Sequence, residues 1–232
     1  MDTTTPASSP ASAQDGAYDL DPAEIRVLGV LIEKAFVTPD SYPLSLNALV
    51  TGCNQLTARE PVMNLSEAEV QDAIDRLIAR RLVSRRDQAS ARVAKYEHQM
   101  RLRHSLPPPE QAVLATLMLR GAQTAGELRS RCERLHRFDD IAAVEAVLEH
   151  LGEKYPALAA QLPRAPGTKE VRYLHLLGGE DALQAAAEAL AGGVAAPTTR
   201  GRHAELEDEV RRLREELDAL RAEFAAFRRQ FD

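Results

Sequence analysis

The residue types that carry most enzyme chemistry are widely separated in this sequence. No two of its six histidines are four residues apart, the spacing that would place two imidazoles on one face of a helix, and none lies beside a cysteine. The chain contains no glycine-rich phosphate loop, no HExxH motif and no nucleophile elbow. The sequence therefore predicts a protein that is not an enzyme, with no cofactor, metal or small-molecule substrate.

Cys53 and Cys132 are the two remaining candidates for nucleophilic chemistry. We interpret them as small buried side chains in preference to reactive thiols, because each lies on the inward face of a predicted helix. Two thiols in 232 residues form no disulfide framework, which indicates a reducing compartment. No run approaches the 18 apolar residues of a membrane span, and residues 1–17 lack the apolar centre of a signal peptide. We therefore expect a cytoplasmic protein without a membrane anchor.

The net charge of the chain is -6, so no overall basic field attracts nucleic acid. Basic side chains nevertheless gather in one region, the basic strip, with Arg101 and Arg103 shortly after it. Either the strip contacts DNA phosphates, or it is a charged sheet edge that prevents unwanted strand pairing, and both interpretations are open. The strip consists of Arg76, Arg80, Arg81, Arg85, Arg86, Arg92 and Lys95.

Three helices and a hairpin are predicted around this strip. Capping boxes begin the first helix at Asp21 and the third at Ser66, and Ser45 begins the second. Gly29 lies inside the first helix, where glycine costs about 1 kcal/mol relative to alanine, so a neighbour is expected to pack closely against it. Three helices followed by a hairpin is the order of a winged-helix domain. The two strands are expected over residues 82–87 and 91–97.

The same pattern occurs a second time. The three helices have counterparts at a constant offset within each helix, which indicates a duplicated domain. A capping box recurs at Thr124, whereas prolines 107–109 offer no capping side chain. A second hairpin is expected over residues 158–164 and 171–177. The aligned residues are Pro22, Glu24, Val27, Leu28 and Leu31 with Pro108, Glu110, Val113, Leu114 and Leu117; Ser45, Leu49 and Cys53 with Thr124, Leu128 and Cys132; and Val70, Ile74 and Leu77 with Val144, Leu148 and Leu151.

The least generic stretch runs from Glu33 to Met63 and reads EKAFVTPDSYPLSLNALVTGCNQLTAREPVM. Together with the preceding helix, it resembles the YceH family of uncharacterised bacterial proteins, whose signature is the phrase LIEK…TPD.YPLSLNAL…CNQ…R.PVM. A weaker resemblance extends over residues 20–178. The resemblance implies two winged-helix domains in tandem and implies no activity.

The polar residues of this signature stretch have two interpretations. They form a polar surface that grips a partner or a nucleic-acid strand, or they satisfy the backbone of a long irregular loop that must stay ordered. We favour the surface slightly, because the resemblance makes these positions a hallmark of the family. The residues are Asn47, Asn54, Gln55 and Arg59.

The C-terminal region is expected to be helical and self-associating. Residues 180–191 are alanine-rich and predict a helix, and residues 192–203 have the composition of a linker. Apolar residues then alternate spacings of four and three, which is a heptad seam in a charged helix. We expect this coiled coil to form a homodimer; the alternative is a helix that folds back on its own chain. The seam consists of Leu206, Val210, Leu213, Leu217, Leu220, Phe224 and Phe227.

The predicted fold is mainly α with small β-hairpins (α+β), as two tandem winged-helix domains and a C-terminal coiled-coil helix. The expected parts are a disordered tail over 1–19, winged-helix domains over 20–104 and 105–178, a short helix and linker over 179–203, and the coiled coil over 204–232.

Two functions remain: fold analogy favours the first, charge favours the second, and we rank the first ahead by a narrow margin. Residues 66–81, around the third helix, hold four acidic and three basic side chains, and the equivalent residues 139–154 hold five and one. Acidic faces repel phosphates, so we expect DNA contact through the wing of the first domain rather than sequence readout by these helices. Winged-helix analogy ranks DNA binding first. The alternative is a protein adaptor that uses the winged-helix surfaces and the coiled coil without touching DNA.

Deletion of residues 204–232 is expected to convert the homodimer into a monomer, because each buried Leu or Phe of the seam contributes roughly 1.5–3 kcal/mol. Light scattering of the full and truncated chains measures the change. A truncated chain that stays dimeric would place the interface in the preceding domains.

Overall fold

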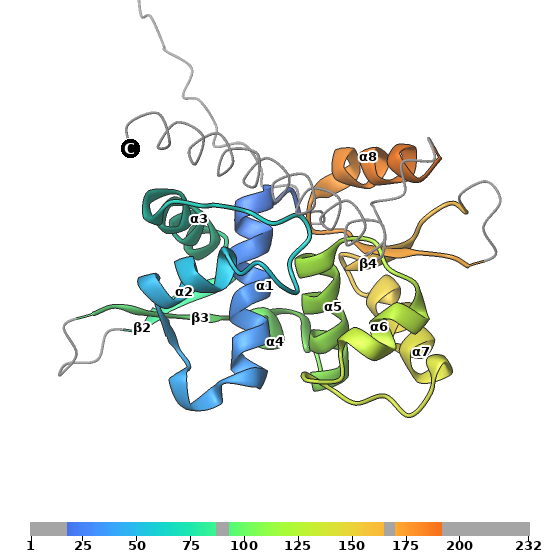
Figure 1. Ribbon diagram of the computed structural model, residues 1–232, viewed down its shortest axis with the longest axis horizontal. Coiled ribbons are helices and arrows are strands. Elements are labelled where there is room, and N and C mark those ends of the chain that lie inside the picture. The colour runs from blue at the N-terminus through green and yellow to red at the C-terminus, as the bar shows by residue number, and fades with distance from the viewer. Residues whose placement is uncertain (1–17, 87–92, 165–169, 192–232) are drawn as a thin grey trace, which may run out of the picture. The chain divides into compact units, whose positions relative to one another are not determined.

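The computed structural model describes residues 18–86, 93–164 and 170–191. This part of the chain is mainly helical, and its few strands form two small antiparallel sheets (Figure 1). The predicted α+β class is therefore confirmed at this level. Arg92 and the whole heptad seam lie outside the described residues, so they stay predictions.

The first half of the chain, residues 18–104, begins its helices where the sequence predicts. The Asp21 carboxylate accepts the Glu24 N–H at 2.8 Å and the Glu24 carboxylate accepts the Asp21 N–H at 3.0 Å. Ser66 and Glu69 form the same capping box at the third helix. The elements are α1 (Pro22–Val37), the 3-10 helix η1 (Pro39–Ser41), β1 (Leu44–Ser45), α2 (Leu46–Cys53), α3 (Glu67–Ala79), β2 (Val83–Arg86), β3 (Lys95–His98) and α4 (Met100–His104).

The sheet of the first half has the strand order β1-β3-β2, which makes β2 an edge strand. The β2–β3 pairing runs from Val83↔His98 to Arg86↔Lys95, so the predicted hairpin is confirmed with shorter strands than expected. β1 pairs with β3 through Leu44↔Tyr96. The sequence does not predict β1, because two residues give no alternation of apolar and polar side chains.

The second half, residues 105–191, repeats this arrangement. Thr124 caps its second helix with a capping box, and no side chain caps the helix that follows Pro107, as predicted. Gln123 pairs with Tyr173 in an isolated bridge that corresponds to the β1–β3 pairing of the first half. The elements are α5 (Pro108–Arg120), α6 (Ala125–Arg131), α7 (Ile141–Glu153), β4 (Ala159–Gln161), β5 (Tyr173–His175) and α8 (Gly179–Ala191).

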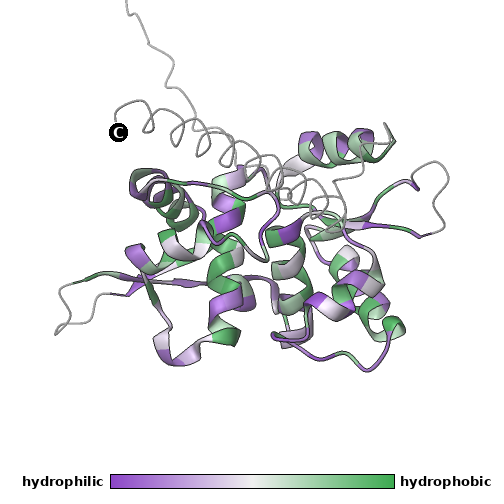
Figure 2. Ribbon diagram, in the orientation of Figure 1, coloured by the Kyte–Doolittle hydropathy of each residue, from purple (hydrophilic) through white to green (hydrophobic). Residues whose placement is uncertain are grey.

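The two halves meet where α1 packs against α5 (Figure 1). Residues 24–32 of α1 and 110–119 of α5 are largely buried, and hydrophobic residues colour much of both ribbons where the helices pack (Figure 2). Gly29 lies at this contact: a Cβ atom there would be 3.0 Å from Cδ2 of Leu119 and 3.2 Å from Cβ of Met118. The predicted close approach of a neighbour to Gly29 is confirmed, and the neighbour is the equivalent helix of the second half.

Candidate functional site

The signature stretch is organised around the buried side chain of Arg59, which is 2% exposed. Its guanidinium forms an ion pair with the Glu33 carboxylate, with Nη2 and Oε2 2.7 Å apart. Burial opposes ionisation of Glu33, but the hydrogen bonds and charge of Arg59 outweigh it and hold the pKa of Glu33 below its usual value. The Arg59 N–H groups donate to Gly52 O, Ala58 O, Gln55 Oε1 and both carboxylate oxygens of Glu33.

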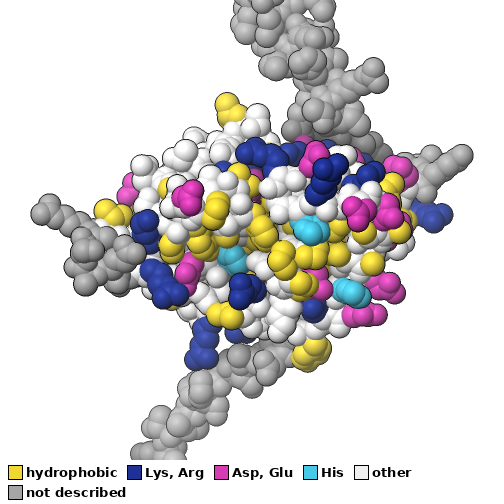
Figure 3. All heavy atoms as spheres, turned by 90° about the horizontal axis from the view of Figure 1, so that it is seen from below, with side chains coloured by type: hydrophobic (Ala, Val, Ile, Leu, Met, Phe, Trp, Pro, Cys, Tyr) yellow, Lys and Arg dark blue, Asp and Glu magenta, His cyan; other side chains and the backbone are white. Residues whose placement is uncertain are grey.

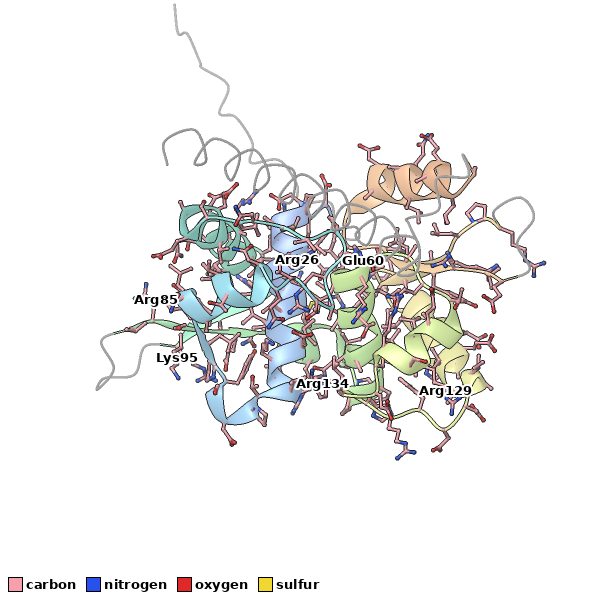
Figure 4. The ribbon with its side chains drawn as sticks, in the orientation of Figure 1. Arg26, Glu60, Arg85, Lys95, Arg129 and Arg134 are labelled. Atoms are coloured by element: carbon pink, nitrogen blue, oxygen red, sulfur yellow. The ribbon has the colours of Figure 1, made fainter. Side chains whose placement is uncertain are left out.

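Further contacts close this loop and fasten it to the rest of the fold. The buried Arg26 on α1 donates to Cys53 O at 2.8 Å and to Pro61 O at 2.5 Å. The side chain of Asn54 bonds both backbone groups of Leu65 at 2.8 Å, which closes the stretch 54–65, here called the signature loop. Figure 4 shows Arg26 on α1 and Glu60 beside α5.

Glu60 connects the signature loop to the second half of the chain. Its backbone N–H donates to Leu119 O, near the end of α5, at 2.8 Å. The loop therefore lies against both α1 and α5, the pair of helices at which the halves meet. The hydrogen bonds within the signature loop hold its backbone in the shape that contacts both helices.

This geometry corrects the expectation that the four polar signature residues share a surface. Arg59 is buried, and Asn54 and Gln55 are half-buried and hydrogen-bonded within the loop. These three therefore agree with the other interpretation, in which polar side chains satisfy the backbone of an ordered irregular loop. Asn47 alone is exposed. The loop instead presents apolar residues to solvent: Leu56 is 81% exposed and Val62 is 48% exposed. Sequence reasoning missed them because an irregular loop has no periodicity from which to infer a face.

Several arginines of the predicted basic strip, among them Arg76, Arg80 and Arg86, form ion pairs with acidic groups of the same chain. Arg76 lies 2.5 Å from Asp21 and 3.1 Å from Asp72. Arg80 lies 3.5 Å from the buried Glu24 and donates to Asp19 O at 3.2 Å. Arg86 lies 2.8 Å from Glu97 across the hairpin. These pairs lower the positive charge that the strip offers to an external anion.

The rest of the strip is divided between two faces of the hairpin. In the strand register Arg85 lies opposite Tyr96 and Arg86 lies opposite Lys95. Arg85 is therefore on one face of the hairpin, and Arg86 and Lys95 are on the other. Figure 4 shows Arg85 and Lys95 on opposite sides of the hairpin. Arg81 is exposed and has φ 59°, the left-handed turn that leads from α3 toward β2. The structure thus brings Arg81 and Arg85 together but not with Lys95: only the first two line the same open pocket.

The cysteines and two of the histidines are structural in character. Both thiols are free and buried, as predicted, and burial raises the pKa of Cys53 to about 12 and that of Cys132 to about 11. His98 and His175 occupy equivalent places at the ends of β3 and β5. Burial lowers the pKa of each to about 4, so both imidazoles are neutral near pH 7. The spacing of the histidines in the sequence does not reveal this equivalence.

Within the residues that the structure describes, no group of three or more His, Cys, Asp and Glu side chains is arranged to hold a metal ion. Across the same residues, none of the helices combines the length and the apolar character that crossing a membrane requires.

Replacement of Arg59 by Met is expected to lower the free energy of unfolding by about 3–5 kcal/mol, because it leaves the half-buried Glu33 carboxylate with Lys34 as its remaining cation and removes the donors to the loop carbonyls. Arg76→Met is the matched control: its ion pairs are exposed, so it should cost no more than about 1 kcal/mol. Urea denaturation measures both. Equal losses would contradict the assignment of Arg59 as the anchor of the loop.

The buried histidines predict a pH dependence of stability. Their folded pKa values lie below the ordinary value of 6.5, so below pH 6.5 the unfolded chain binds more protons than the folded one. The free energy of unfolding should therefore fall from pH 6.5 toward pH 4, by up to about 1.4 kcal/mol per pH unit for each histidine. Urea denaturation at pH 7 and pH 5 measures this fall. The double variant His98→Gln, His175→Gln should flatten it, and an unchanged pH dependence would contradict the prediction.

Comparison with known proteins gives a consistent result. A family model described as "Protein of unknown function, DUF480" matches residues 20–168. A UPF0502 protein of Azoarcus sp. (strain BH72) is 76% identical, over 99% of this chain and 99% of that protein. UPF0502 proteins of Aromatoleum aromaticum and Janthinobacterium sp. (strain Marseille) are 72% and 51% identical, over 88% and 94% of this chain and 90% and 94% of those proteins. The resemblance read from the signature phrase is confirmed, and this chain belongs to the DUF480 (UPF0502) family of bacterial proteins.

Proposed function

We propose that this protein is a non-enzymatic adaptor built from two tandem winged-helix domains, which binds a protein partner through the signature loop. The order of three helices and a hairpin occurs twice, and the residues before the second helix pair with the hairpin in both halves, as the strand β1 in the first and as the isolated bridge of Gln123 with Tyr173 in the second. This repetition supports the winged-helix assignment over 20–104 and 105–178. A homodimer joined through residues 204–232, acting in the cytoplasm, completes the proposal.

The exposure of Leu56 and Val62 on a fixed loop carries this proposal. A solvated loop ordinarily turns polar side chains outward, whereas this loop turns Arg59 and Asn54 inward and leaves apolar side chains at its surface. Because Arg26 and Arg59 already hold the backbone, little conformational entropy is lost when a partner covers the loop. A preorganised apolar surface is suited to a protein partner.

The charge of the third helices favours the same function. α3 exposes Glu67, Asp72 and Asp75, and α7 exposes Glu145 and Glu149, so neither presents a basic face to a DNA groove. On the face shown in Figure 3, Lys and Arg side chains lie at the left and along the top, and Asp and Glu side chains are more numerous toward the right. The third helix of the second half, α7, in particular has no arginine or lysine to offer a phosphate backbone.

A photo-crosslinking amino acid at position 56 tests the adaptor function. In native cells it is expected to give one discrete protein adduct, while the same amino acid at position 141, an exposed residue of α7, should not give that adduct. Val62→Ser should weaken the adduct from position 56 without changing thermal stability. The same adducts from both positions, or none from position 56, would contradict the proposal.

DNA binding through the wing of the first half is the second candidate, favoured by the exposed Arg81 and Arg85. The double variant Arg85→Ala, Arg86→Ala should then weaken binding to random duplex DNA about equally for all sequences and reduce the salt slope by about 1 for each lost phosphate contact. Fluorescence anisotropy at low and physiological salt measures both. Absence of binding at low salt, or unchanged affinity in the double variant, would exclude this candidate.

A further inference from the structure

We propose that the open pocket beside β2 binds an extended acidic segment of a partner protein, which adds a strand to the edge of the sheet and inserts an apolar side chain. The pocket, about 540 Å³ in volume, lies apart from the signature loop and has none of its residues in its lining. It therefore provides a second interaction surface on the first half, independent of the one that carries the proposed function.

The floor of this β2 pocket is apolar. It consists of Ile78 from the last turn of α3, Val83 from β2 and Leu102 from α4. Leu102 is 75% exposed and presents most of this apolar surface to solvent, whereas Ile78 is half-buried and Val83 is buried beneath them. Such a floor favours an aliphatic or aromatic side chain, and it gives a DNA phosphate no favourable contact.

The rim of the pocket is basic. Arg81, Arg85 and Arg103 line it, and no aspartate or glutamate is among the described residues of its lining. Arg103 is positioned by a hydrogen bond from its Nε to the Tyr18 hydroxyl, at 3.0 Å. Guanidinium groups around an apolar floor match a segment in which carboxylates flank an apolar residue, because arginine binds carboxylates through paired hydrogen bonds.

The backbone of β2 offers the third element of recognition. β2 is the edge of the three-stranded sheet, and on the side away from β3 no strand of residues 18–86, 93–164 or 170–191 pairs with it. An edge strand can bond an incoming extended chain through its backbone groups. Val83 and Arg85 are two residues apart on β2 and share one face, so the exposed Arg85 lies beside the base of the pocket, where Val83 is buried.

The occupant follows from these observations together. Backbone bonding at an edge selects an extended chain, the apolar floor selects one aliphatic or aromatic residue, and the rim selects carboxylates on either side of it. On the other face of the hairpin Arg86 lies beside Glu97, whereas the described lining of the pocket holds arginines and no carboxylate. Phosphate of DNA would satisfy only the last of these features.

Fluorescence anisotropy tests the proposal with a fluorescein-labelled peptide of about eight residues, the length of one strand, in which one Leu is flanked by Glu and Asp. Binding with a Kd on the order of 10–100 µM is expected for so short a segment. Replacement of its Leu by Ser, or of its acids by Lys, should weaken binding at least about tenfold. In the full-length protein, Leu102→Asp and Arg81→Glu should each weaken binding of the original peptide at least about tenfold. Both residues are exposed, and Arg81→Glu keeps a Cβ at the left-handed position, so neither change should unfold the chain.

Matched controls separate this site from the other two surfaces. Lys95→Glu alters charge on the opposite face of the hairpin and Leu56→Ser alters the signature loop, so neither should change peptide binding. Bound peptide should slow hydrogen exchange of the β2 amides. The proposal is overturned if the peptide does not bind, if Leu102→Asp has no effect, or if β2 gains no protection. It is also overturned in favour of the DNA candidate if random duplex DNA binds and Arg81→Glu and Lys95→Glu weaken it equally.

Discussion

The buried ion pair between Arg59 and Glu33 is the interaction on which the signature loop depends. Removing two charges from water is costly, and the cost is offset only where the remaining donors and acceptors are satisfied. Arg59 meets this condition, because each of its donor atoms bonds an oxygen of the loop, of α2 or of α1. The same bonds fix the loop backbone, so that Glu60 reaches Leu119 at the contact between the halves. One buried side chain thus connects loop shape with the packing of the two halves.

The duplicated framework shows which parts are structural, because they occur twice. Glu24 and Glu110 are both buried on the first helix of their half, and each faces a cation at the end of the third helix, Arg80 at 3.5 Å and Lys154 at 2.9 Å. The buried cysteines and the neutral histidines are repeated in the same way. The signature loop is not repeated: the shorter connection between Cys132 and Asp140 takes its place. A feature found in only one copy is a better candidate for a specific function than the framework that both copies share.

The sequence predicted what depends on local rules. Capping boxes located the starts of α1, α3 and α6, and Gly29 indicated a close helix contact before its partner was known. It could not predict what depends on contacts between distant residues. Arg59 and Glu33 are 26 positions apart, and no periodicity shows that a charged loop residue turns inward while Leu56 turns outward. The α4 helix is a similar case, because five residues are too few for an amphipathic pattern.

The positions of the basic-strip side chains in the structure explain why a count of charges along the sequence overstates the affinity for nucleic acid. Arg76, Arg80 and Arg86 each meet a carboxylate of their own chain, and the hairpin register separates Arg85 from Lys95. The arginines that share a face, Arg81 and Arg85, do so around an apolar floor rather than along a flat track. Phosphates need a continuous row of cations and gain nothing from leucine or valine, whereas an acidic protein segment uses both kinds of contact. The geometry that weakens the case for DNA is therefore the same geometry that favours a protein partner.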